Sequence, residues 1–199
     1  MNGSYEVLGG ELMTKMLAAL AVLLAVPAQE KNANPDLLYK KDLGISISKP
    51  PKNEEWDFKD KGYFANAQLI VGHRVDTLWI EIFTQDKAGG FTYYDTKGSA
   101  ENMWKNLSGD PKNKDAKKVG EIKTSKLPGG GAGGVQCHML DMTYTRDDKP
   151  YELRSWCFIG KDNQNFYNVV MVSEKDMYKK HQKVADFCLA SIRTWKLPK

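Results

Sequence analysis

Three cysteines, Cys137, Cys157 and Cys188, have side chains that can pair, bind metal or act as nucleophiles. An apolar segment near the start of the chain is typical of an export signal, and an oxidising compartment permits disulfides. A turn at residues 146–148 would place Cys137 opposite Cys157, and a two- or four-residue turn would shift this register by one. The rise per residue of strand and helix brings Cys188 to roughly the same level along the sheet as Cys157. We therefore predict a Cys157–Cys188 disulfide, with Cys137–Cys157 as the alternative.

A metal site is the other use of these thiols, with His138 or His181 as a further ligand. His138 follows Cys137 directly in a predicted strand and must face the opposite side. His181 lies about two helical turns before Cys188, which is about 10 Å along the axis. No closely spaced CxxC or HxxxH pair is present, and His73 is expected in a turn without a partner. We predict neither a metal nor a cofactor.

Paired carboxylates are the remaining candidates for acid–base chemistry. Asp141 and Glu152 lie on neighbouring predicted strands, with His138 on the same strand as Asp141. Arg146 and Arg154 could equally balance these acids on a hairpin surface. No GxSxG nucleophile elbow occurs. We expect a protein without catalytic activity and keep small-ligand binding or hydrolysis near His138, Asp141 and Glu152 as the alternative.

A glycine-rich segment, PGGGAGG at residues 128–134, contains the spacing GxGxxG of nucleotide-binding loops. That fingerprint needs a helix directly after the glycines, so that the amino end of the helix meets the phosphates. Here the next residues, VQCHML, read as a strand. The pattern therefore predicts a mobile hairpin loop, and the loop is a possible binding element through Gly129, Gly130, Gly131, Gly133 and Gly134.

The elements that would position these residues are mostly strands. Alternating or apolar runs predict an antiparallel sheet, with a short helix after Ser99 and an exposed charged loop at residues 110–118. The final segment, 173–195, predicts one long helix with Ser173 as its cap and Phe187, Cys188 and Ile192 on one apolar stripe. This helix should lie back across the sheet, which gives an α+β domain. The predicted strands are 43–49, 64–71, 76–84, 119–127, 135–145, 151–159 and 166–172.

The amino-terminal region predicts export. Residues 14–28, TKMLAALAVLLAVPA, have a basic start, an apolar core and small residues at the end, as in a secretory signal peptide. We assign residues 1–28 to the signal, with Met13 or Met16 as possible true starts and cleavage after Ala28. Residues 29–36 form a flexible lead-in, and residues 37–199 form one domain. The apolar run is too short to span a membrane, so we expect a soluble periplasmic or extracellular protein.

The charge distribution along the chain bears on one further function, nucleic-acid binding. The 29 basic and 25 acidic residues give a formal net charge of +4 and are interspersed along the chain. The lysine-rich stretch at residues 112–118 is interrupted by Asp115 and lacks interleaved aromatic residues, so we expect no nucleic-acid binding.

The order of features resembles the PsbP-like family. The resemblance rests on the strand Gly-Ile-Ser-Ile ending at Pro50-Pro51, on Trp56, and on Phe187 with Ser191-Ile192 in the last helix, and covers about residues 37–197. It implies an α/β/α sandwich with a central antiparallel sheet. The family includes the extrinsic photosystem II subunit, a Ran-binding nuclear import factor and bacterial exported proteins of unknown role. It transfers no catalytic residue and implies a module that binds a protein or envelope component.

Overall fold

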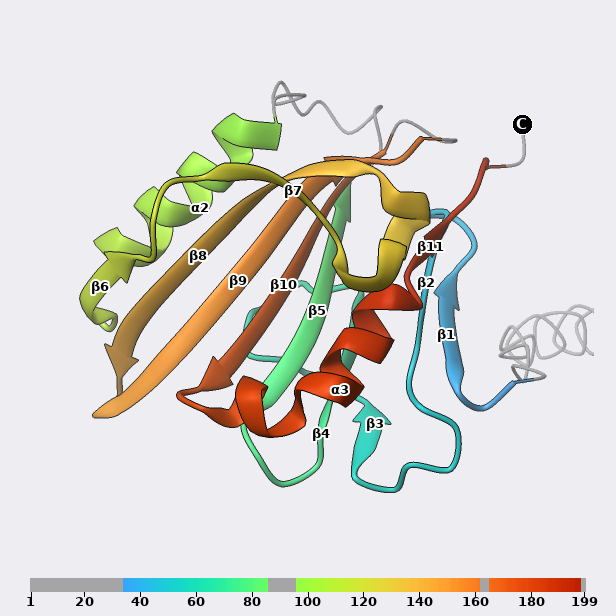
Figure 1. Ribbon diagram of the computed structural model, residues 1–199, viewed down its shortest axis with the longest axis horizontal. Coiled ribbons are helices and arrows are strands. Elements are labelled where there is room, and N and C mark those ends of the chain that lie inside the picture. Colours follow the sequence, from blue (N-terminus) through green and yellow to red (C-terminus); the bar gives the residue numbers. More distant parts are fainter. Residues whose placement is uncertain (1–33, 86–95, 162–164, 198–199) are drawn as a thin grey trace, which may run out of the picture. The chain divides into compact units, whose positions relative to one another are not determined.

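The computed structural model describes residues 34–85, 96–161 and 165–197 (Figure 1). The chain divides into two units, Met1–Ala33 and Asn34–Lys199, and only the second is described. The predicted signal peptide therefore lies outside the described residues. The strands are β1 (Leu37–Lys40), β2 (Ile45–Ser48), β3 (Trp56–Phe58), β4 (Leu69–His73), β5 (Leu78–Gln85), β6 (Lys114–Lys118), β7 (Lys123–Lys126), β8 (Gln136–Arg146), β9 (Lys149–Ile159), β10 (Phe166–Glu174) and β11 (Arg193–Thr194). The helices are α2 (Thr96–Gly109), the 3-10 segment η1 (Pro128–Gly134) and α3 (Met177–Ala190).

A large antiparallel sheet forms the centre of the second unit. Its strand order is β3-β4-β5-β10-β9-β8-β6, and β7 also pairs with β8. A smaller sheet has the order β1-β2-β11. The α+β class and the antiparallel sheet predicted from the sequence are confirmed. Among the described residues, no helix is both long enough and apolar enough to span a membrane.

Alternation along the strands sends apolar side chains to both faces of the large sheet. On β5, Leu78, Ile80 and Ile82 belong to one buried cluster, while Trp79 and Phe83 pack against another. The first cluster includes Cys188 and Leu189 of α3, and the second includes Ala100 and Leu107 of α2. Figure 1 shows α3 in red across β5 and β10, and α2 in green beside β8.

The predicted carboxy-terminal helix is wrong in its length. Ser173 is not a helix cap, because β10 continues to Glu174, which pairs with Tyr151 of β9. Asp176 then turns the chain with a φ of 67°, and α3 runs only from Met177 to Ala190. The predicted stripe is correct for Cys188, which is fully buried, but Phe187 is 43% exposed.

The charged segment predicted as an exposed loop contains a strand. Within it, β6 pairs with β8 at one edge of the sheet, and its lysines point to solvent. Ala116 is half-buried against the cluster under α2, and the lysines around it oppose pairing of this edge with other chains.

The glycine-rich segment forms the connection between β7 and β8, as the hairpin prediction requires. It is packed against the end of α3, where Ala132 N donates to Ile192 O at 2.7 Å. A Cβ atom at Gly131 would overlap the carbonyl oxygen of Leu189. Gly131 is therefore required by close packing of two backbones. A binding role of the five glycines stays a prediction.

Candidate functional site

A groove of about 500 Å³ lies between α2 and the face of the sheet formed by β5 and β10. Its volume falls in the range of small-molecule sites, about 300 to 1,000 Å³. The lining combines phenylalanines with carboxamides, and none of its described residues has a charged side chain. The lining residues are Phe64, Ala65, Asn66, Gln68, Phe83, Thr84, Ser99, Asn102, Met103, Asn106, Leu107, Phe166 and Asn168.

Two carboxamides on the sheet side are held in fixed orientations. The Gln68 Oε1 atom accepts a hydrogen bond from Thr84 N at 3.0 Å. The Asn168 Oδ1 atom accepts one from the Ser155 hydroxyl at 2.7 Å. Because both carbonyl oxygens are engaged by the protein, each side chain has its NH₂ group left as a donor. The Asn168 NH₂ group has only a weak acceptor, Met103 Sδ at 3.7 Å.

The aromatic part of the groove depends on a buried carboxylate. Glu81 of β5 is fully buried and accepts hydrogen bonds from the backbone N–H groups of Tyr63 and Phe64. Burial raises the pKa of Glu81 to about 7, against the lowering effect of these two N–H donors. A side chain at Gly62 would overlap the carboxylate, so glycine is needed there. Glu81 thereby fixes Phe64, whose ring meets that of Phe83 edge-on at 6.2 Å.

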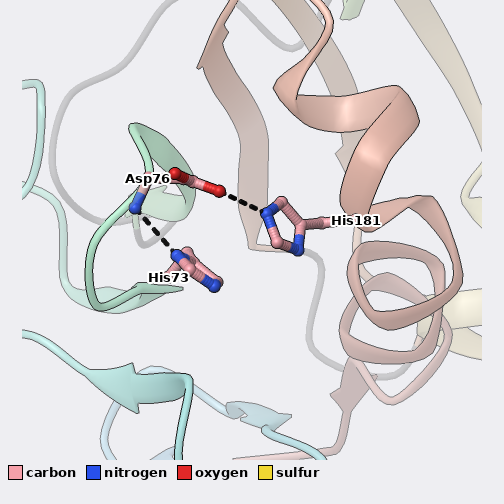
Figure 2. Close-up of side chains that lie close together, drawn as sticks. All are labelled: His73, Asp76 and His181. Carbon is pink, nitrogen blue, oxygen red and sulfur yellow. Dashed lines mark hydrogen bonds and ion pairs between the residues drawn. The ribbon is translucent and has the colours of Figure 1, made fainter.

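A second cluster joins the β4–β5 turn to α3 (Figure 2). His181 Nε2 lies 2.6 Å from Asp76 Oδ2, and Lys180 Nζ lies 2.7 Å from the same oxygen. The rings of His73 and His181 are 4.2 Å apart, and Trp56 contacts both rings edge-on. The bonds from Lys180 and His181 lower the pKa of Asp76 to about 2.

His73, Asp76 and His181 offer ligand atoms within 4.8 Å of one another and are therefore candidates for holding a metal ion. The Nδ1 atom of His73 accepts hydrogen bonds from Asp76 N at 2.8 Å and from Val75 N at 3.3 Å. Neutral His73 therefore carries its proton on Nε2, which is buried without a hydrogen-bond partner and has no lone pair for a metal. A metal would also have to displace Lys180 from Asp76. As arranged, the cluster is a polar clasp between turn and helix.

The prediction that His73 lacks a partner is wrong. Its partners come from a turn and from a helix more than a hundred residues along the chain, so spacing in the sequence could not indicate the cluster. Burial, and the positive charge of His181 when protonated, lower the pKa of His73.

The predicted acid–base residues are not brought together. His138 lies toward α2, where its Nδ1 atom is 2.7 Å from Thr96 Oγ1. Asp141 is paired across the strands with Arg154, whose guanidinium lies over the ring of Tyr178 in α3. Asp141 and Glu152 do line a common hollow of about 200 Å³ with Arg154. Because His138 faces the other side of the sheet, the three side chains do not converge.

The predicted disulfides are wrong for this structure, in which all three cysteines are buried and free. The β8–β9 turn has two residues, so Cys157 pairs with His138 instead of Cys137. Cys157 belongs to the cluster under α2, whereas Cys137 and Cys188 belong to the cluster under α3. The sheet therefore separates Cys157 from Cys188. Burial raises the thiol pKa of Cys137 to about 11 and those of Cys157 and Cys188 to about 12.

Comparison with known proteins supports the fold. No protein-family model matches the chain, and no curated protein sequence is significantly similar to it. Among solved structures, the cyanobacterial PsbP of Synechocystis sp. PCC 6803 superposes with a TM-score of 0.54 at 9% identity, over 85% of this chain and 99% of that chain. The fold is PsbP-like.

A second solved structure also aligns with the PsbP-like domain. LpqN of Mycobacterium tuberculosis, a protein involved in cell envelope biogenesis, aligns with a TM-score of 0.49 and 12% identity, over 79% of this chain and 88% of that chain. The superposition on cyanobacterial PsbP confirms the PsbP-like fold that the sequence resemblance implied.

Proposed function

We propose that this protein is an exported, non-catalytic binding module of the cell envelope, and that the groove beside α2 is its binding site. The observation that carries the proposal is the composition of the groove. Its described lining residues combine apolar side chains with carboxamides and two hydroxyls, and none of them is a histidine, carboxylate, lysine or cysteine that could act as an acid or base or activate a hydroxyl. Such a lining can hold a ligand but offers no group that would change it.

Export is supported by the sequence of residues 14–28, which has the organisation of a signal peptide. We further propose an α/β/α sandwich for residues 37–199, with α2 and α3 as the outer layers. The separation of their buried contacts into two clusters supports this arrangement.

A hydrolytic function at His138, Asp141 and Glu152 is less favoured. His138 is hydrogen bonded toward α2, while Asp141 is paired with Arg154 near α3. A general base and a second acidic group on opposite sides of a sheet cannot reach one substrate atom.

The test is native mass spectrometry of the full chain purified from the compartment to which it is exported. Asn102→Trp places an indole in the groove, and Lys105→Trp places the same indole on an exposed position of α2 outside the lining. We expect a bound small molecule in the wild type and in Lys105→Trp, and its loss in Asn102→Trp. Equal retention by all three proteins, or conversion of the bound molecule to products, would contradict the proposal.

A further inference from the structure

We propose that the ligand of the groove is a neutral saccharide, bound through the carboxamides and the phenylalanine rings. This inference rests on the proposed function of the groove and adds the chemical class of its ligand. It uses the charge of the lining, the orientation of the amides and the strand order of the sheet.

None of the described residues that line the groove is charged, which disfavours ionic ligands. A phosphate, nucleotide or acidic sugar placed in the groove would lose water without gaining an ion pair. A cationic ligand would meet no carboxylate there, because Glu81 is bound to the backbone of residues 63–64 on the protein side. The ligand is therefore neutral.

Carboxamides line both walls of the groove. Gln68 and Asn168 present NH₂ donors from the sheet, and Asn102 and Asn106 lie on α2. An amide supplies a donor and an acceptor a short distance apart, which matches the adjacent hydroxyl groups of a sugar ring. An aliphatic lipid chain would instead desolvate these amides without replacing their hydrogen bonds, at a cost of about 1 to 3 kcal/mol for each.

Phenylalanines supply the apolar surface that a sugar also requires. Phe64, Phe83 and Phe166 line the groove, and Phe64 is fixed by the backbone hydrogen bond to Glu81. The C–H faces of a pyranose ring pack on aromatic rings while its hydroxyls point outward to polar partners. A preset ring lowers the entropy cost of binding.

A peptide is the main neutral alternative, and the sheet topology disfavours it. Peptides commonly bind by adding a strand to an open sheet edge. Both strands under the groove are internal, because β5 pairs with β4 and β10, and β10 pairs with β5 and β9. A peptide would therefore find no fully open strand edge to extend there.

The experiment is an NMR titration of the full-length protein with maltotriose, N,N′,N″-triacetylchitotriose, an acetylated and amidated Ala-Gly-Ala peptide, and 1-octanol. We follow the side-chain NH₂ signals of Gln68, Asn102, Asn106 and Asn168 and the methyl signal of Met103. We expect at least one saccharide to shift these signals, while the peptide and octanol leave them unchanged.

The double variant Asn102→Leu/Asn106→Leu removes the α2 amides and preserves their approximate size. We expect saccharide binding to weaken by about tenfold, which corresponds to one or two neutral hydrogen bonds. Gln182→Leu on α3 is the matched amide deletion outside the groove and should bind as the wild type does.

The outcomes separate the ligand class from the function. Shifts at these groove signals with a saccharide, weakened in the double variant, support the inference. Shifts only with the peptide or octanol overturn the saccharide and leave a binding groove in place. If no saccharide shifts the signals, the inference fails, whereas the proposed function fails if Asn102→Trp retains the co-purified molecule or if that molecule is converted to products.

Discussion

Replacing Glu81 by glutamine should change how the stability of the domain depends on pH. Glu81 is completely buried in β5, and its two oxygens accept the backbone N–H groups of Tyr63 and Phe64. Burial nevertheless raises its pKa from 4.5 to about 7, so the folded state binds this proton more tightly than the unfolded chain does. The stabilising contribution is therefore complete below pH 4.5 and is lost as the pH rises through about 7.

The size of this effect follows from the two pKa values. Each unit of difference is worth about 1.4 kcal/mol, so the raised pKa of Glu81 corresponds to about 3 kcal/mol between pH 4.5 and pH 7. Glutamine resembles the protonated acid in shape, but its NH₂ group cannot accept the second of the two backbone N–H groups that Glu81 binds. This loss should cost about 1 to 3 kcal/mol at every pH. On top of that constant cost, the stability of Glu81→Gln relative to the wild type should rise by about 3 kcal/mol between pH 4.5 and pH 8.5.

Urea unfolding of both proteins at several pH values between 4.5 and 8.5 measures this difference directly. The contributions of titratable groups common to both proteins cancel when the two free energies of unfolding are subtracted. A difference that stays constant across the pH range would refute the raised pKa of Glu81. A difference that changes with pH in the opposite direction would show that the two N–H donors outweigh the cost of burial.

Three further predictions concern the clasp, the glycine segment and the thiols. Asp76→Asn should lower the melting temperature, because it weakens the contacts of Asp76 with α3. This loss should shrink as the pH falls from the unfolded pKa of 3.8 through the folded pKa of about 2, because the contribution of Asp76 to stability is lost over that range. Gly131→Ala should cost about 1 to 3 kcal/mol in urea unfolding, whereas Gly109→Ala, with open space around it, should cost less than about 1 kcal/mol. The three cysteines should stay unalkylated in the folded protein at pH 8 and react only after denaturation, as read by intact mass; prompt labelling would contradict their burial.

Periodicity located the central strands because their side chains alternate between two buried layers. The predicted strand 135–145 corresponds to β8 at Gln136–Arg146, and 151–159 falls within β9 at Lys149–Ile159. The prediction failed where sequence pattern and packing differ. The segment after residue 172 looked helical from its polar residues, but pairing with neighbouring strands extends β10 to Glu174.

The candidate site could not be predicted from spacing. The groove takes residues from four separate parts of the chain, which are the segment before β4, β5, α2 and β10, and none of them belongs to a motif. Asparagine and phenylalanine also occur throughout ordinary surfaces and cores. The clasp could not be predicted from sequence spacing either, because His73 and His181 meet only after α3 has packed on the sheet. The disulfide prediction failed because the register of β8 against β9 differs by one residue from the predicted register. This difference places Cys157 on the opposite face of the sheet from Cys137 and Cys188.

The most direct test of the central claim is a crystal structure of the protein purified from its native envelope together with the small molecule that it retains. The account predicts the ligand between α2 and strands β5 and β10, in contact with Asn102 and Asn168. A ligand bound instead at the glycine segment Pro128–Gly134 or along the lysine-rich strand β6 would contradict it.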